Sequence, residues 1–207
     1  MTLFGEVRVV EDVPGAFADL LVEEAPESVA LSGGSLARRC YQDLASRHLA
    51  WDRISVFFGD ERVVPVDSDD SNEGMARRAL LDAAQPAAIH SLVGLGAGAY
   101  DVLVRSVPPI DVVHLGLGAD GHTASLFPGA PQLDVADRFV VDAGDAQHPH
   151  PRITFTFPAI ARCRLAVVTV AGEDKRNAWR RVNTSDDLPA SRIRAPRVLW
   201  LVDPTVL

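Results

Sequence analysis

The stretch Asp111–Gly129, DVVHLGLGADGHTASLFPG, joins an apolar run to a turn that carries an aspartate and a histidine between its glycines. A short run dominated by Val and Leu is typical of a parallel strand that is buried on both faces. The turn beyond it would lie at the carboxyl end of that strand, where open parallel sheets bind their ligands. This stretch therefore predicts an α/β sheet with a functional loop at its edge.

The same alternation of strand-length apolar runs and helical periods continues along the chain, and the connecting loops are short. We expect strands at Glu6–Val10, Ser28–Ser32, Arg53–Phe58, Asp111–Leu117, Arg138–Val141, Arg152–Phe157, Leu165–Ala171 and Arg197–Val202. We expect helices at Pro14–Ala25, from Ser35 to about Ala50, from Asn72 to about Ala83, and from Glu173 to about Val182. No linker or repeat divides the 207 residues, so we predict one α/β domain over 1–207, with a mostly parallel central sheet and helices on both faces.

Composition and charge exclude several classes of protein. A net charge of -8 argues against nucleic-acid binding, and no apolar run is long enough to span a membrane. The N-terminus has no secretory pattern, and Cys40 and Cys163 lack any metal or redox spacing, so we expect a cytoplasmic setting with reduced cysteines. His148 and His150 form a lone pair in a loop, so we expect no metal.

The glycine turn allows two interpretations. Gly116, Gly118 and Gly121 satisfy the G-x-G-x-x-G pattern of dinucleotide-binding proteins. That pattern needs a full-length helix after the turn, whereas Pro128 follows within two turns, and Asp120 would repel the pyrophosphate. We therefore favour a catalytic loop in which His122 is a general base and Asp120 fixes its tautomer or contacts the substrate.

Two further segments follow strands and carry suitable chemistry. Ser32, Gly33, Gly34 and Ser35 run directly into a helix, with Ser35 as the expected N-cap, so their amides can hold a phosphate; an ordinary capped turn is an equally good interpretation. Asp60, Glu61 and Arg62 follow an apolar strand. Arg62 is a candidate anion contact, with Asp60 or Glu61 orienting it or a substrate hydroxyl, although charge runs are usually solvated loops.

Lys175 is the single lysine among 20 basic residues and lies in the first turn of a helix, where its charge opposes the helix dipole. A compact ammonium group at this position suits a phosphate, although chance use of lysine is the alternative. Because all four segments follow strands of one parallel sheet, we expect them to converge on one edge.

Taken in order, LSGGS, FFGDERVVP with DSNEGMARRALL, GLGADGHTASLFPG, RITFTFPAI and AGEDKRNAWRRV with LPAS resemble the 6-phosphogluconolactonase family over nearly the whole chain. The resemblance implies a Rossmann-like three-layer fold, shared with glucosamine-6-phosphate isomerases and deaminases. It implies hydrolysis of 6-phospho-D-glucono-1,5-lactone to 6-phosphogluconate without a metal or cofactor. Isomerisation with deamination of glucosamine 6-phosphate, or non-catalytic sugar-phosphate binding, are the alternatives.

Carried over by motif, the catalytic histidine of the family is His122, the basic phosphate contacts are Arg62 and Lys175, and the glycine loop is Ser32–Ser35. Arg152, at the start of RITFTF, is a further candidate for the pocket. The chain departs from the family at Leu36-Ala37, where Thr-Pro is usual, which puts substrate affinity in doubt more than the reaction. The expected partner is a phosphorylated sugar lactone, bound by a monomer or weak homodimer that contacts neither nucleic acid nor membrane.

Overall fold

The central feature of the computed structural model, which describes residues 3–144, 149–184 and 187–207, is a seven-stranded parallel sheet. Its order is β1-β10-β9-β6-β2-β3-β5, and every pairing is parallel. The strands are β1 (Glu6–Val9), β2 (Ser28–Leu31), β3 (Ser55–Phe58), β5 (Ala88–Ile89), β6 (Val112–Gly116), β9 (Leu165–Val170) and β10 (Arg197–Val202). β6 and β9 lie side by side in the middle, as the apolar sequences of both segments predict.

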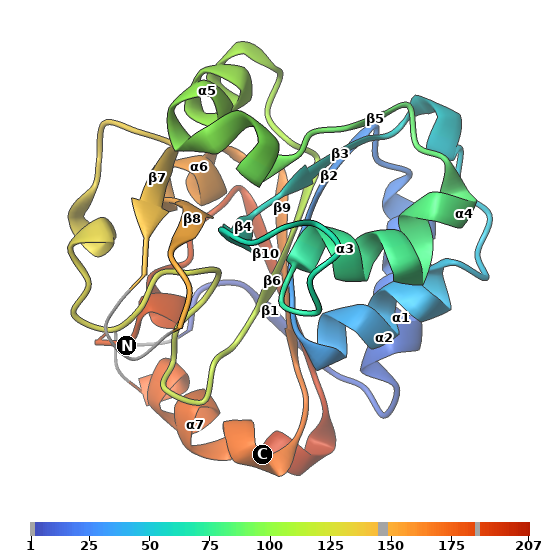
Figure 1. The fold of residues 1–207 in the computed structure, drawn as a ribbon. Coiled ribbons are helices and arrows are strands. Elements are labelled where there is room, and N and C mark those ends of the chain that lie inside the picture. The colour runs from blue at the N-terminus through green and yellow to red at the C-terminus, as the bar shows by residue number, and fades with distance from the viewer. Residues whose placement is uncertain (1–2, 145–148, 185–186) are drawn as a thin grey trace.

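Helices and a smaller sheet cover the two faces (Figure 1). The α-helices are α1 (Val13–Glu24), α2 (Ser35–Leu44), α3 (Asn72–Ala76), α4 (Asp82–Ala84), α5 (Leu92–Ser106), α6 (Phe157–Arg162) and α7 (Arg176–Thr184). α1 to α4 lie on the right of the sheet in Figure 1, and α5, α6, β7 and β8 lie on the left. This arrangement confirms the predicted three-layer α/β class.

A second sheet of three antiparallel strands was not expected from the sequence. It has the order β4-β8-β7 and consists of β4 (Asp60–Arg62), β8 (Arg152–Phe155) and β7 (Val140–Ala143). Gly59 joins the two sheets, because its N–H donates to the carbonyl of Leu31 in the first sheet and its own carbonyl accepts the N–H of Phe155 in the second. The charged segment after β3 is therefore a strand and not a loop.

Two helices differ from the prediction. No helix was predicted at Leu92–Ser106, which forms α5 with a break at Gly96, where φ is 75°. The helix that starts at Ser35 ends at Leu44 and not near Ala50. The segment from Asn72 to Ala84 is continuous as predicted, although Arg77–Leu81 is wound as a π-helix.

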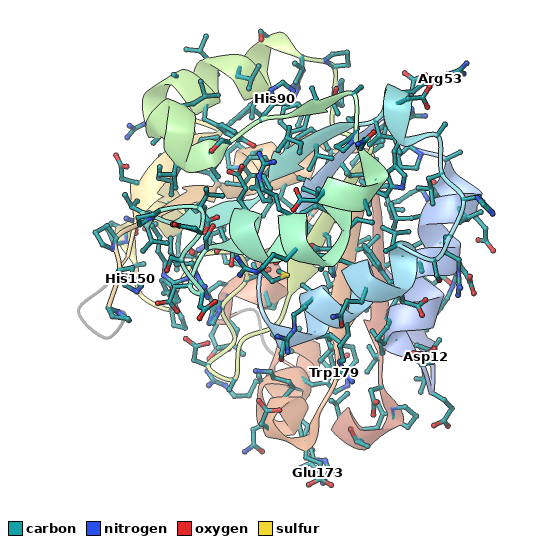
Figure 2. All side chains as sticks on the ribbon, turned by 45° about the vertical axis from the view of Figure 1, so that its right-hand side comes forward. Asp12, Arg53, His90, His150, Glu173 and Trp179 are labelled. Carbon is teal, nitrogen blue, oxygen red and sulfur yellow. The ribbon has the colours of Figure 1, made fainter. Side chains whose placement is uncertain are left out.

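The direction of the strands sets the functional edge. In Figure 2, Arg53, which precedes β3, lies at the top, and Glu173, which follows β9, lies at the bottom. The carboxyl ends of the parallel strands therefore point downward in this view, toward the loops that the sequence singled out. In the described part of the chain, the helices are too short or too polar to cross a membrane.

Candidate active site

A cleft of about 170 Å³ opens at the carboxyl ends of β2, β3, β6 and β9. Each of the four segments that the sequence singled out contributes side chains or backbone to it. The residues from those segments that line the cleft are Ser32, Gly33, Asp60, Arg62, Gly118, His122 and Lys175, joined by Arg152 from β8. The histidine and the glycine loop therefore share one cavity, as their convergence required.

His122 and Asp120 form a close pair on the loop after β6. Nδ1 of His122 lies 2.6 Å from Oδ1 of Asp120, and the same oxygen accepts the backbone N–H of His122 at 3.1 Å. The hydrogen bond from His122 is the main reason that the pKa of Asp120 falls to about 2. Because an ionised carboxylate can only accept, Nδ1 must donate, and Nε2 is then the nitrogen able to take up a proton.

The tight loop that presents this pair depends on glycine. A Cβ on Gly118 would lie 2.1 Å from Nδ1 of His122 and 2.6 Å from Oδ1 of Asp120. The N–H of Gly118 donates to the carbonyl of His122, and Gly121 has a φ of +91°, which a residue with a side chain rarely adopts. In the described stretch 117–144, the loop is followed only by the short 3-10 helix Pro131–Asp134, which is not the full-length α-helix that a dinucleotide fingerprint needs.

Two arginines stand directly opposite each other across the second sheet. The β4–β8 register pairs Arg62 with Arg152, and both line the cleft. Like charges at directly opposite positions of antiparallel strands repel each other, and an anion between them relieves that repulsion. The guanidinium of Arg62 donates to the carbonyl of Asp70, whereas its buried Nε has no acceptor among the described residues. This end of the cleft is built to receive an anion.

The glycine loop differs in detail from the prediction. The N-cap of α2 is Gly34, with a φ of 97°, and Ser35 is the first helical residue, so the expected serine cap was wrong. The N–H of Ser32 donates to the hydroxyl of Tyr41 at 2.7 Å and is therefore already occupied. No side chain caps α2, so the amides of its first turn remain available to a ligand.

Lys175 also lines the cleft, from the short 3-10 turn Glu173–Lys175. Its Nζ is 3.0 Å from Oδ2 of Asp174, and its side chain is about a quarter exposed. It also lines an adjoining depression of about 210 Å³ with Ser35. The ammonium group can therefore reach an anion held at the start of α2.

Glu61 does not face the cleft, although the sequence made it a candidate for substrate contact. Side chains alternate along β4, so Asp60 and Arg62 point one way and Glu61 points the other. The carboxylate of Glu61 accepts the amides of Arg62, Asn72 and Glu73 and the hydroxyl of Ser71. Burial nevertheless raises the pKa of Glu61. Three of these four hydrogen bonds hold the start of α3 in place.

Asp60 keeps a place in the cleft and is tied to two neighbours. Its Oδ2 accepts the hydroxyl of Ser125 at 2.7 Å, and its carbonyl accepts the side-chain amide of Asn72 at 3.0 Å. Asn72 also lines the cleft, and its Oδ1 lies where a Cβ on Gly33 would stand. Asn72 was not among the predicted site residues, although it lies in DSNEGMARRALL, one of the motifs that carry the family resemblance. Asn72 therefore connects Asp60 of the second sheet to Gly33 of the glycine loop.

Within residues 3–144, 149–184 and 187–207, no group of three or more His, Cys, Asp or Glu side chains is arranged to hold a metal ion. The donors in the cleft are cationic side chains and backbone amides, which suit an anionic ligand better than a cation.

Comparison with known proteins agrees with this geometry. The family model for glucosamine-6-phosphate isomerases/6-phosphogluconolactonase matches residues 7–200. A protein of Nostoc sp. named 6-phosphogluconolactonase is 41% identical over 197 residues, which covers 85% of this chain and 81% of that protein. A protein of Synechocystis sp. with the same name is 38% identical over 205 residues, which covers 88% of this chain and 84% of that protein.

The 6-phosphogluconolactonase structure from Trypanosoma cruzi superposes with a TM-score of 0.86 at 27% identity, covering 100% of this chain and 97% of that one. Sequence, fold and the arrangement of the cleft point to one group of proteins, and they confirm the resemblance that the motifs indicated. The chain belongs to the glucosamine-6-phosphate isomerase/6-phosphogluconolactonase family.

Proposed function

We propose that the protein hydrolyses 6-phospho-D-glucono-1,5-lactone to 6-phosphogluconate in the oxidative pentose phosphate pathway. One observation carries the proposal: His122, positioned by Asp120, shares a cleft with the opposed arginines and the glycine loop. The lactonase names of the similar relatives support this activity over the deamination of glucosamine 6-phosphate.

The phosphate is held by cations and by backbone. The amides at the start of α2 supply donors and the positive end of the helix dipole, and Lys175 adds an ammonium group. Arg62 and Arg152 offer further donors, and the unused Nε of Arg62 is one of them. Held in this way, the phosphorylated sugar presents C1 of its lactone to the loop that carries His122.

Nε2 of His122 takes a proton from water, and the resulting hydroxide adds to C1 to form a tetrahedral oxyanion. When the C1–O bond of the ring breaks, His122 returns the proton to the leaving ring oxygen. Asp120 remains ionised at neutral pH and keeps the imidazole in the tautomer that this transfer needs. A δ-lactone is an activated ester, so positioning and one general base, each worth about 100-fold or more, are sufficient.

The side chain of Asp60 lies in the same cleft and is anchored by Ser125. Its carboxylate is placed to accept a hydroxyl of the sugar. We assign it this substrate contact and leave Glu61 out of the binding site, because the Glu61 carboxylate is fully used inside the protein.

Proton release from freshly prepared 6-phosphogluconolactone, corrected for spontaneous opening, tests the activity. Unphosphorylated gluconolactone should be a much poorer substrate, because it cannot use the cationic contacts. Equal rates on the two lactones, or ammonia release from glucosamine 6-phosphate, would overturn the proposal.

His122→Ala tests the general base. We expect turnover to fall at least about 100-fold while 6-phosphogluconate still binds. His150→Ala is a matched control, because His150 pairs with Asp70 at 3.0 Å and is 30% exposed, against 31% for His122, but does not line the cleft. Unaltered hydrolysis in the His122 variant would exclude this role.

We further propose that residues 1–207 act as one domain, as a monomer or weak homodimer in the cytoplasm. Cys40 and Cys163 are buried and reduced, and burial raises the pKa of each thiol to about 12, which suits a reducing compartment. Gel filtration with light scattering tests the oligomeric state.

A further inference from the structure

A buried chain of polar groups lies directly beneath the glycine loop. The hydroxyl of Tyr41, on α2, accepts the N–H of Ser32 at 2.7 Å and donates to the carbonyl of the same residue at 3.1 Å. The same hydroxyl lies 2.9 Å from Nδ1 of His114, on β6, and Nε2 of His114 lies 2.9 Å from Oγ1 of Thr169, on β9. The phenol thus joins α2, the loop after β2 and β6, and His114 extends the connection to β9.

For a neutral imidazole, only one arrangement of the protons in this chain of groups makes every hydrogen bond. If His114 carries its proton on Nε2, the one Tyr41 proton must serve either Nδ1 or the Ser32 carbonyl, and one contact is lost. If the proton is on Nδ1, the phenol accepts from Ser32 and His114, donates to the Ser32 carbonyl, and Thr169 donates to Nε2. All four hydrogen bonds are then made, which specifies the Nδ1–H tautomer.

Both titratable members are fully buried and uncharged. Tyr41 is 0% exposed and His114 is 1% exposed. Burial raises the pKa of Tyr41 and lowers the pKa of His114 to about 3. The ring of Phe17 lies over the imidazole, with the centroids 4.2 Å apart. The proton arrangement therefore stays fixed across the neutral pH range.

We propose that Tyr41, oriented by His114 and Thr169, is a positioning residue for substrate phosphate, because it fixes both peptide groups of Ser32 so that the following amides face the cleft. This inference rests on the proposed function, since it assigns the phosphate to that loop. Tyr41 itself does not line the cleft. Its effect is exerted through the backbone of the loop.

The second tyrosine of the chain provides a matched control. Tyr100 is also 0% exposed, and its hydroxyl accepts the amide of Phe58 at 2.8 Å and donates to the carbonyl of His90 at 3.3 Å. Tyr100→Phe therefore removes a buried hydroxyl with an equivalent bonding pattern, at the end of β3 instead of β2.

The experiment compares wild type, Tyr41→Phe and Tyr100→Phe in steady-state kinetics on the phosphorylated and the unphosphorylated lactone. Calorimetric titration with 6-phosphogluconate measures binding without turnover. For Tyr41→Phe we expect KM for the phosphorylated lactone and the Kd of 6-phosphogluconate to rise about tenfold, with turnover of gluconolactone nearly unchanged. Tyr100→Phe should lower thermal stability without shifting either constant.

Equal losses on both lactones, or equal shifts of Kd in the two tyrosine variants, would overturn the proposal and leave Tyr41 with a structural role only. If Tyr41→Phe does not fold, Thr169→Val removes the far end of the chain, and a rise of about threefold in the same two constants is expected. Unchanged constants in that variant would also overturn it. Absent hydrolysis by the wild type would refute the proposed function alone, because the binding titration still tests the positioning role.

Discussion

His114 makes the folded protein sensitive to mild acid. Its contacts are Tyr41, Thr169 and Phe17, none of which carries a charge, and burial lowers its pKa from 6.5 to about 3. The unfolded chain binds a proton at this position as the pH falls below 6.5, and the folded protein does not. Stability is therefore intact above that pH and decreases as the pH falls toward 3.

The size of the effect follows from these two values. One proton taken up only by the unfolded state costs about 1.4 kcal/mol per pH unit below 6.5, which amounts to about 2 kcal/mol of unfolding free energy between pH 7 and pH 5. Because His114 is only 1% exposed, solvent screening does not reduce this figure substantially.

Urea unfolding at pH 7, 6 and 5, followed by the fluorescence of the buried Trp179 and Trp200, measures the slope. His114→Gln is less stable at pH 7, but its stability should fall with pH by about 2 kcal/mol less than that of wild type. The difference between the two slopes isolates His114 from the other histidines. Parallel slopes would refute the reasoning.

Three further predictions concern the cleft and the strand β4 beside it. Gly118→Ala brings a Cβ to 2.1 Å from Nδ1 of His122, so kcat should fall about 100-fold in the lactone assay. Gly98→Ala, in α5 and outside the cleft, adds a Cβ that meets nothing within 4 Å and should lose far less, and equal losses would contradict the assignment. In Glu61→Gln, an NH₂ group replaces one of the two carboxylate oxygens that together accept four hydrogen bonds, so the unfolding free energy in urea should fall by about 2–4 kcal/mol. An unchanged urea midpoint would argue against this role of Glu61. Lys175→Met should raise KM for the phosphorylated lactone about tenfold with kcat largely retained, whereas a lost kcat at constant KM would place Lys175 at the reacting atoms.

Six of the seven strands of the main sheet could be predicted from the sequence, because most of them are rich in apolar residues and several are followed by a distinct loop. The strand β5 was missed because it has only two residues. β6 and β9 were identified in this way, and so was the edge at which the loops meet. The helix α5 was missed because its three glycines indicate a loop, whereas packing in the folded protein tolerates a break at Gly96.

The second sheet explains the main error at the candidate site. Three charged residues in a row suggested a loop, so Asp60 and Glu61 were treated as equivalent candidates beside Arg62. As a strand, the same segment alternates, and Glu61 is turned away from the other two. The partner strand β8 is distant in sequence, so no local pattern could reveal the pairing. Ser32 shows the same limit, because its bond to Tyr41 depends on how α2 packs.

The order of the strands determines when the main sheet can be completed during synthesis of the chain. β9 lies between β6 and β10, and β1 pairs only with β10, so the middle of the sheet is completed by the segments that are synthesised late. Until they emerge from the ribosome, β6 presents an unpaired apolar edge of the kind that drives aggregation. Slow translation before Leu165, or depletion of chaperones that shield nascent chains, should therefore lower the yield of this protein more than that of one whose sheet is built from neighbouring hairpins.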